Sequence, residues 1–369
     1  MKMKRYIPLL EMIVAFIAAL LIILIFFGKE ENFENLALGE FTKPLFCMSN
    51  NYPIQTMGFR DNGKVVDGWK KRGSHDVILL LGNSQSHSIN QLKQGDRTFP
   101  ALLFDSLQKK NADVITSSVP NANLEEFYLL YKAWSDELKI KALVIPVFLD
   151  DMREEGINTV FFTSLTGFQI TDTNAVALKI NKELKGMSEN KNTDLSALKK
   201  TYQERTETKL NHWLDREFEP WRLRQNIRGE FFNNLYKLRN TVFGINAQSK
   251  RKVIKEAYDK NWLALKTMIT DCEQKHIEVL IYIPPIRNDV EIPYIRSEYD
   301  KLKQDLISFC SEHHASYLNI ESCVPGKYWG YKGTRTLFGK NDLDFMHFQY
   351  AGHVIVANKL QPEIEKLIQ

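Results

Sequence analysis

The sequence predicts a three-layer α/β/α domain with a central five-stranded parallel sheet, an N-terminal transmembrane helix and a helical insertion. Short apolar runs, each long enough for one buried strand, alternate with amphipathic helical patterns. A much longer apolar run lies near the amino end, and a long charged stretch interrupts the alternation in the middle of the chain. These three observations set the fold class.

The composition is that of an ordinary globular protein. The chain has 369 residues, of which 44% are hydrophobic and 25% charged, so a large core can form. The net charge of +4 is spread along the chain and gives no reason to expect nucleic-acid binding. No Cys/His spacing indicates a metal, and no motif indicates a cofactor. The pairing of the four cysteines stays open, and they are Cys47, Cys272, Cys310 and Cys323.

The amino end predicts a membrane anchor. Three basic residues precede an apolar run from Ile7 to Phe27, which is long enough to span a bilayer. The charges before and after the run favour a cytoplasmic amino end. A cleaved signal peptide is the alternative, but Phe27-Gly28-Lys29 makes a poor cleavage site. We therefore expect an uncleaved single-pass anchor at 1–28 in the cytoplasmic membrane. A leader at 29–73 and a domain at 74–369 would follow on the periplasmic or cell-surface side.

The rest of the chain alternates between strand and helix patterns. Five apolar runs predict strands buried on both faces: Val77–Leu81, Val114–Ser117, Ala142–Phe148, Val279–Ile283 and Ser316–Ile320. Among the helical patterns between them, one begins at Asn123 with Glu126 three residues later, which indicates a capping box. Because strand and helix alternate, we expect parallel strands with helices on both faces.

A stretch at about 157–262 breaks this alternation. It is much longer than usual strand–helix connections and is rich in Lys, Glu and Arg. We interpret it as a helical insertion packed against the core. A lid over the ligand crevice is a further role that such an insertion can take.

In a parallel sheet, the loops at the carboxyl ends of the strands form the ligand crevice. This topology places Ser84, Asn121, Asp150 and Arg287 on one edge. Ser84 follows Gly82-Asn83, directly after a predicted strand, so its hydroxyl can point into the crevice and its N–H can face an oxyanion. A plain strand-to-helix turn is the alternative, because Ser86 replaces the second glycine of a G-x-S-x-G elbow.

A possible base for this serine lies near the carboxyl end. Asp344 and His347 are three residues apart, just before the last helix, so the carboxylate can reach Nδ1 and leave Nε2 to take a proton. A helix-capping aspartate with an incidental histidine is the alternative. His353 lies within an apolar helical pattern and is expected to pack, and His87 is expected to shape the turn after Ser84.

Three features together resemble the SGNH (GDSL-like) hydrolase superfamily: "LLLGNSQ", the five-strand rhythm, and "DFMHF" followed by "GH". The resemblance covers roughly residues 74 to 360. It implies that Ser84 is the nucleophile, His347 the base and Asp344 its orienting acid, acting through an acyl-enzyme. Within the superfamily, the chain resembles membrane-anchored teichoic-acid D-alanyl transfer proteins and polysaccharide O-acetyltransferases, the latter acting with a membrane-bound O-acyltransferase.

The chain departs from the superfamily in two blocks. The second block normally offers a glycine N–H to the oxyanion hole, but here the loop reads "SSVPNANLEE". Asn121 or Asn123 could supply a donor, and Asn123 could equally cap its helix. The third block normally carries Gly-x-Asn, but here Asp150 and Asp151 cannot donate while ionised. Arg287 could compensate, bind an anionic substrate group, or form a salt bridge to either aspartate.

These features predict a membrane-anchored, extracytoplasmic serine acyltransferase or esterase. It would move a small acyl group, acetyl or D-alanyl, on a cell-envelope glycan or glycolipid through an acyl-serine intermediate. One alternative is a carbohydrate esterase that removes acetyl groups. Another is a non-catalytic accessory protein that binds a glycan or a membrane O-acyltransferase.

Overall fold

The computed structural model describes residues 39–165, 167–192, 213, 216–217, 235, 237–333 and 341–369. The chain divides into two units, and the larger one comprises residues 41–191, 247–332 and 342–369. The predicted anchor at 7–27 lies outside the described residues and stays a prediction. Within the described ranges, no helix is long and apolar enough to cross a membrane.

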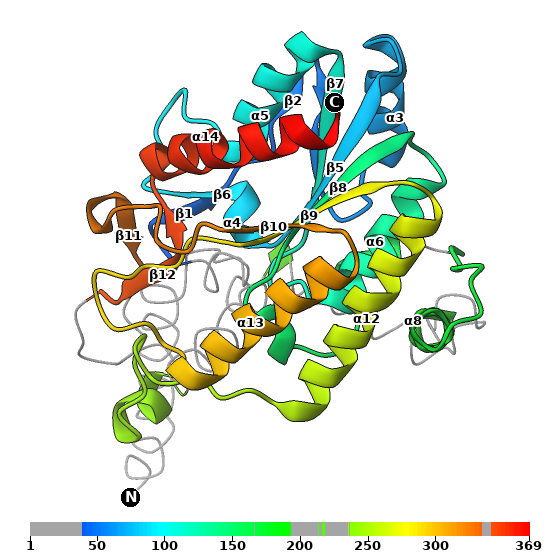
Figure 1. Ribbon diagram of the computed structural model, residues 1–369. Coiled ribbons are helices and arrows are strands. Elements are labelled where there is room, and N and C mark those ends of the chain that lie inside the picture. Colours follow the sequence, from blue (N-terminus) through cyan, green and yellow to red (C-terminus); the bar gives the residue numbers. More distant parts are fainter. Residues whose placement is uncertain are drawn as a thin grey trace, which may run out of the picture. The chain divides into compact units, whose positions relative to one another are not determined.

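The larger unit contains a six-stranded parallel sheet with the strand order β10-β9-β8-β5-β7-β4 (Figure 1). The central strands are almost entirely apolar because both of their faces are buried. The strands are β4 (Gln55–Met57), β5 (Asp76–Gly82), β7 (Ala112–Ser118), β8 (Ile140–Pro146), β9 (Glu278–Ile283) and β10 (Ser316–Asn319).

The expectation of five strands was wrong by one. The sixth strand, β4, pairs in parallel with β7, with Gln55 opposite Thr116. It has only three residues, two of them polar, so it leaves no apolar run in the sequence. It lies in the segment interpreted as a leader, as does α3 (Asn62–Lys71), which packs Val65 into the core. Residues of this segment from Phe41 on therefore belong to the unit that holds the sheet.

Helices cover both faces of the sheet, which confirms the α/β/α layers (Figure 1). The β5 side chains alternate between two cores, with Leu79 in one and Leu80 in the other. The Leu79 core includes residues of α3, α6 (Leu124–Ser135), α12 (Lys255–Gln274) and α13 (Arg296–Glu312). The Leu80 core includes residues of α5 (Phe99–Leu107) and α14 (Tyr350–Leu367).

The structure also contains shorter elements outside this sheet. Two antiparallel pairs matter for the site: β1 (Thr42–Pro44) with β6 (Ser88–Asn90), and β11 (Trp329–Tyr331) with β12 (Leu343–Phe348). A third such pair joins β2 to β3. The remaining elements are β2 (Met48–Ser49), β3 (Tyr52–Pro53), α4 (Ser84–His87), η2 (Gln108–Lys110), η3 (Asp151–Arg153), α7 (Val160–Ser164), α8 (Ala175–Asn192) and η4 (Gly326–Tyr328).

The described parts of the stretch at 157–262 contain helices joined by non-helical segments at 167–174 and 243–254. The stretch contains α7, α8 and the beginning of α12, and α8 packs Val176 and Ile180 against the core. This agrees with a helical insertion. Much of the stretch between 193 and 236 lies outside the described residues, so the role as a lid stays a prediction.

Candidate active site

The turn after β5 places Ser84 at the edge of the sheet. Asn83 caps α4, because its Oδ1 accepts a hydrogen bond from the Gln85 N–H at 3.0 Å. The Ser86 hydroxyl donates to the Asn83 carbonyl at 2.7 Å. A Cβ on Gly82 would lie 2.1 Å from the Ser86 Oγ, so the last position of β5 has no room for a side chain. The tight turn leaves Ser84 as the first residue of α4.

His347, on β12, lies between Ser84 and Asp344. The Ser84 Oγ is 2.9 Å from His347 Nε2, and His347 Nδ1 is 2.9 Å from Asp344 Oδ2. The other carboxylate oxygen accepts the backbone N–H groups of Met346 and His347, at 2.9 and 3.0 Å. Ser84 is 8% exposed, His347 2% and Asp344 0%. The structure thus brings together the three residues that the sequence singled out.

The environment of Asp344 keeps it ionised. Burial alone would raise the pKa of this carboxyl, but the charge of His347 and its hydrogen bond more than offset burial and hold the pKa well below its usual value. An anionic Asp344 fixes the proton of His347 on Nδ1. Nε2 is then an acceptor facing the Ser84 hydroxyl, which is the arrangement that general-base catalysis needs.

Two further side chains hold Asp344. The Thr42 hydroxyl donates to Asp344 Oδ2 at 3.3 Å. The Asn90 amide donates to the Thr42 Oγ1 at 2.8 Å and also lies 3.4 Å from Asp344 Oδ2. Sequence reasoning missed both residues, because they are far from Asp344 in the chain and belong to no motif.

Gln85 connects the serine turn to the histidine strand. Its side-chain amide donates to the carbonyls of Pro285, at 2.9 Å, and Met346, at 2.7 Å. Met346 directly precedes His347, so these bonds set how far α4 lies from the imidazole. Gln85 belongs to the "LLLGNSQ" segment, but no role was predicted for it. Its position beside the candidate nucleophile was the available signal.

The two asparagines of the loop after β7 differ in their environments. Asn123 forms a complete capping box with Glu126, and its amide donates to the Gly156 carbonyl at 2.8 Å. Its side chain therefore caps α6, which confirms one of the two interpretations of this residue. Asn121 has a left-handed backbone with φ of 53°, and it is exposed. Within the part of the chain that the structure describes, the Asn121 N–H has no hydrogen-bond partner.

Asp150 and Asp151 have different partners. Asp150 accepts hydrogen bonds from Arg251, from Arg153 at 3.2 Å and from the Tyr294 hydroxyl at 3.0 Å. Asp151 is buried and accepts from the Asn83 amide at 3.2 Å, behind the serine turn. Burial raises the pKa of Asp151 well above its usual value, and the hydrogen bond from Asn83 offsets this only in part.

Arg287 does not pair with these aspartates, so that interpretation was wrong. Its guanidinium forks onto Asp289, at 2.8 and 3.1 Å, and donates to the Gly330 carbonyl at 3.0 Å. An aspartate two residues away reaches the guanidinium without closing a long loop. Arg287 therefore braces the loop after β9 against β11.

The other two histidines considered for the site, His353 and His87, have structural roles. His353 accepts the Phe99 N–H at 3.1 Å and donates to the Ser88 carbonyl at 3.3 Å. His87 lies 2.8 Å from the Ser118 hydroxyl. Both are fully buried, and burial lowers the pKa of each to about 3, so both are neutral at physiological pH. All four cysteines are free thiols. No group of acidic, histidine and cysteine side chains among the described residues could hold a metal ion.

No family model matches the sequence, and no curated protein matches it. The solved structures that the chain resembles include esterases and hydrolases. Axe2, an acetylxylan esterase from Geobacillus stearothermophilus, shares 11% identity over 80% of this chain and 96% of its own, with a TM-score of 0.38. LAE5, an alpha/beta hydrolase enzyme from the metagenome of Lake Arreo, shares 10% identity over 79% and 96%, with a TM-score of 0.39. Because these likenesses are distant, the proposed reaction rests on the geometry of this chain's own site.

Proposed function

We propose that the protein is a serine esterase or acyltransferase that works through an acyl-serine intermediate. The observation that carries the proposal is the unbroken hydrogen-bonded series from the Ser84 hydroxyl through His347 to Asp344, with 2.9 Å at both contacts of the imidazole. A buried, ionised aspartate, an oriented imidazole and a hydroxyl at a sheet edge together form an activated nucleophile.

The reaction has two halves. The Ser84 Oγ attacks the acyl carbon of an ester while its proton moves to His347 Nε2. The bond to the leaving alkoxide then breaks, and the imidazolium returns the proton to that oxygen as an alcohol. In the second half, a water or an acceptor hydroxyl attacks the acyl-serine. His347 takes the attacker's proton and returns it to the Ser84 Oγ.

Two backbone N–H groups serve as donors for the oxyanion. The Ser84 N–H is the first of α4 and has no partner within that helix. The Asn121 N–H follows a strand beside β5, and its left-handed backbone takes the conformation in which glycine is common. Asp150 is held by two arginines, so it provides no third donor. One missing donor slows such reactions by roughly 10²–10³, and we expect slow turnover with simple esters.

The sequence supports a finer proposal for the setting of this reaction. The apolar run at 7–27 would anchor the chain in the cytoplasmic membrane, with the sheet domain on the extracytoplasmic side. There the serine would accept an acetyl or D-alanyl group, supplied with the help of a membrane-bound O-acyltransferase, and pass it to a cell-envelope glycan or glycolipid. Passing the group to water would make the protein a carbohydrate esterase instead.

Active-site labelling tests the nucleophile. The protein is incubated with a fluorophosphonate or with p-nitrophenyl acetate, and the modified peptide is identified by mass spectrometry. We expect one adduct, on Ser84, which is absent from Ser84→Ala and strongly reduced in His347→Ala. Adducts on other residues only, or equal labelling of His347→Ala, would contradict the proposal. Loss of envelope acylation in cells that carry correctly inserted Ser84→Ala would exclude a purely accessory role.

A further inference from the structure

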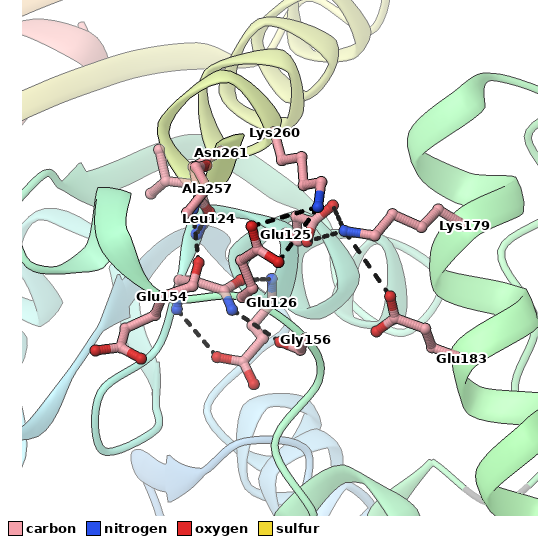
Figure 2. Close-up of polar contacts among 12 residues, drawn as sticks. Leu124, Glu125, Glu126, Glu154, Gly156, Lys179, Glu183, Ala257, Lys260 and Asn261 are labelled. Atoms are coloured by element: carbon pink, nitrogen blue, oxygen red, sulfur yellow. Dashed lines mark hydrogen bonds and ion pairs between the residues drawn. The ribbon is translucent and has the colours of Figure 1, made fainter. Parts of the chain in front are cut away.

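The larger unit contains a cleft of about 950 Å³, lined in part by the loops that follow the two strands flanking β5. Its walls come from the loop after β7, the beginning of α6, the loop at 154–158, α8 and Lys260 of α12 (Figure 2). This volume falls in the range of pockets that enclose small molecules or short oligomers.

Two hydrogen bonds connect the loops that line the cleft to the Ser84 turn. The loops that line it follow β7 and β8, the two strands that flank β5. Val119, in the first loop, donates its N–H to the Gly82 carbonyl at 3.0 Å. Asp151, at the beginning of the second loop, accepts from the Asn83 amide at 3.2 Å. Asn121, whose N–H is the second oxyanion donor proposed above, lines the cleft itself.

Hydrogen bonds and ion pairs among the lining residues fix the walls of the cleft. The Glu126 carboxylate accepts the N–H groups of Asn123 and Asn158, at 3.0 and 2.5 Å, and so joins α6 to the loop after η3. Lys179 of α8 lies between Glu125 and Glu183, and its bonds to Glu125 measure 2.5 and 2.6 Å (Figure 2). The walls are therefore preorganised, and much of their charge is compensated within the lining.

The lining side chains that have no partner within the described residues include both hydrogen-bond donors and acceptors. The side chains of Asn121, Lys182 and Glu154 form no hydrogen bond or ion pair within the described residues. They offer an amide, an ammonium and a carboxylate. The one apolar side chain in the lining, Ile157, is itself buried. A ligand with charges of a single sign would meet both signs in this lining.

We propose that this cleft binds a short, hydroxyl-rich segment of the glycan that carries or accepts the acyl group. Each sugar hydroxyl both donates and accepts a hydrogen bond, which suits a lining of mixed donors and acceptors. The inference rests on the proposed acyl chemistry at Ser84, because it assigns the cleft to the same substrate. The cleft then selects the sugar, and Ser84 acts on the ester beside it.

Gly186 allows the cleft to be filled without disturbing the fold. It lies within α8 and lines the cleft, and a Cβ added to it meets nothing within 4 Å. Gly186→Trp would fill part of the cleft, while Gly186→Ala adds only a methyl group and favours the helix. Gly63, in α3, also has open space around an added Cβ but does not line the cleft. Gly63→Trp is therefore a matched control.

The direct test is titration calorimetry with unacylated xylotriose and triacetylchitotriose. We expect the wild type to bind at least one trisaccharide, and Gly186→Trp to bind it at least about tenfold more weakly. Gly186→Ala and Gly63→Trp should stay within about twofold of the wild type. Thermal unfolding checks that every variant is folded. Binding of neither trisaccharide by the wild type, or equal binding by Gly186→Trp, overturns the inference.

A parallel measurement separates this inference from the proposed function. Hydrolysis of p-nitrophenyl acetate needs Ser84 but no sugar site, so folded Gly186→Trp should retain it within about twofold. If the wild type binds a trisaccharide in a Gly186-sensitive way but never acylates Ser84, the acyl chemistry fails and the cleft stands only as a glycan site. If Ser84 is acylated but no trisaccharide binds, only the cleft inference fails.

Discussion

Asn90 donates a hydrogen bond to the hydroxyl of Thr42 at 2.8 Å, and both side chains lie against one oxygen of Asp344. The two residues face each other across β1 and β6, where Thr42 is the partner of Asn90 in the strand register. Both are fully buried, so water cannot replace either bond. This pair fixes the rotamer of the carboxylate that orients His347.

Removing the Thr42 hydroxyl should therefore impair catalysis more than folding. A hydrogen bond to a buried charged group is worth about 1.5–3 kcal/mol, so we expect Thr42→Val to lower kcat by about tenfold or more with little change in KM. Thr42→Ser keeps the hydroxyl and should stay close to the wild type. Hydrolysis of p-nitrophenyl acetate measures the effect, and equal activity of the two variants would show that the bond is unimportant.

Replacing Asp344 by asparagine should be far more damaging. The amide keeps the shape of the side chain but can donate to His347 Nδ1, which favours the tautomer with its proton on Nε2. The imidazole then cannot accept the Ser84 proton, and we expect kcat to fall by about 10⁴. Stopped assays at several pH values measure this loss. If Asp344→Asn retains more than about a tenth of wild-type activity, Asp344 does not orient the base.

The sequence allowed the three central residues of the site to be predicted because each stands in a local pattern. Ser84 follows an apolar strand, and Asp344 and His347 are only three residues apart. The supporting contacts follow no such pattern. Thr42 and Asn90 reach Asp344 only through the pairing of two three-residue strands. Their contact therefore depends on the whole tertiary fold.

The same distinction explains the errors in the sheet and at Arg287. β4 is too short and too polar to show as an apolar run, although its register with β7 is regular. Arg287 was correctly placed at the carboxyl edge, but the choice among its possible partners depended on the path of one loop. The nearest carboxylate in the chain, Asp289, bound it. Composition and spacing do not determine such choices among neighbouring carboxylates.

Gln85 provides a test of how the serine turn is held. Gln85→Met keeps the length of the side chain but leaves the carbonyls of Pro285 and Met346 without their donor. An unsatisfied buried polar group costs about 1–3 kcal/mol, so urea unfolding should show a loss of stability of that size.

We also expect labelling of Ser84 by a fluorophosphonate to slow in Gln85→Met, because α4 is no longer fixed against β12. A matched change is Ser135→Ala, which removes a side-chain bond to a carbonyl on α6, away from the site. It should leave the labelling rate unchanged. If Gln85→Met loses stability but labels at the wild-type rate, Gln85 supports only the fold.

The buried histidines predict how stability depends on pH. His353 is neutral in the folded protein because burial lowers its pKa to about 3, whereas in the unfolded chain its pKa is near 6.5. Between these values the unfolded state binds more protons than the folded state, so stability is fully present above pH 6.5 and falls as the pH drops towards 3. The slope from one such histidine is at most about 1.4 kcal/mol per pH unit, and His87 adds a second contribution of the same sign.

His353→Gln retains an acceptor and a donor but cannot be protonated. We expect urea unfolding between pH 6 and pH 4 to show a slope shallower by about that amount in this variant, and an unchanged slope would mean that His353 titrates normally in the folded protein.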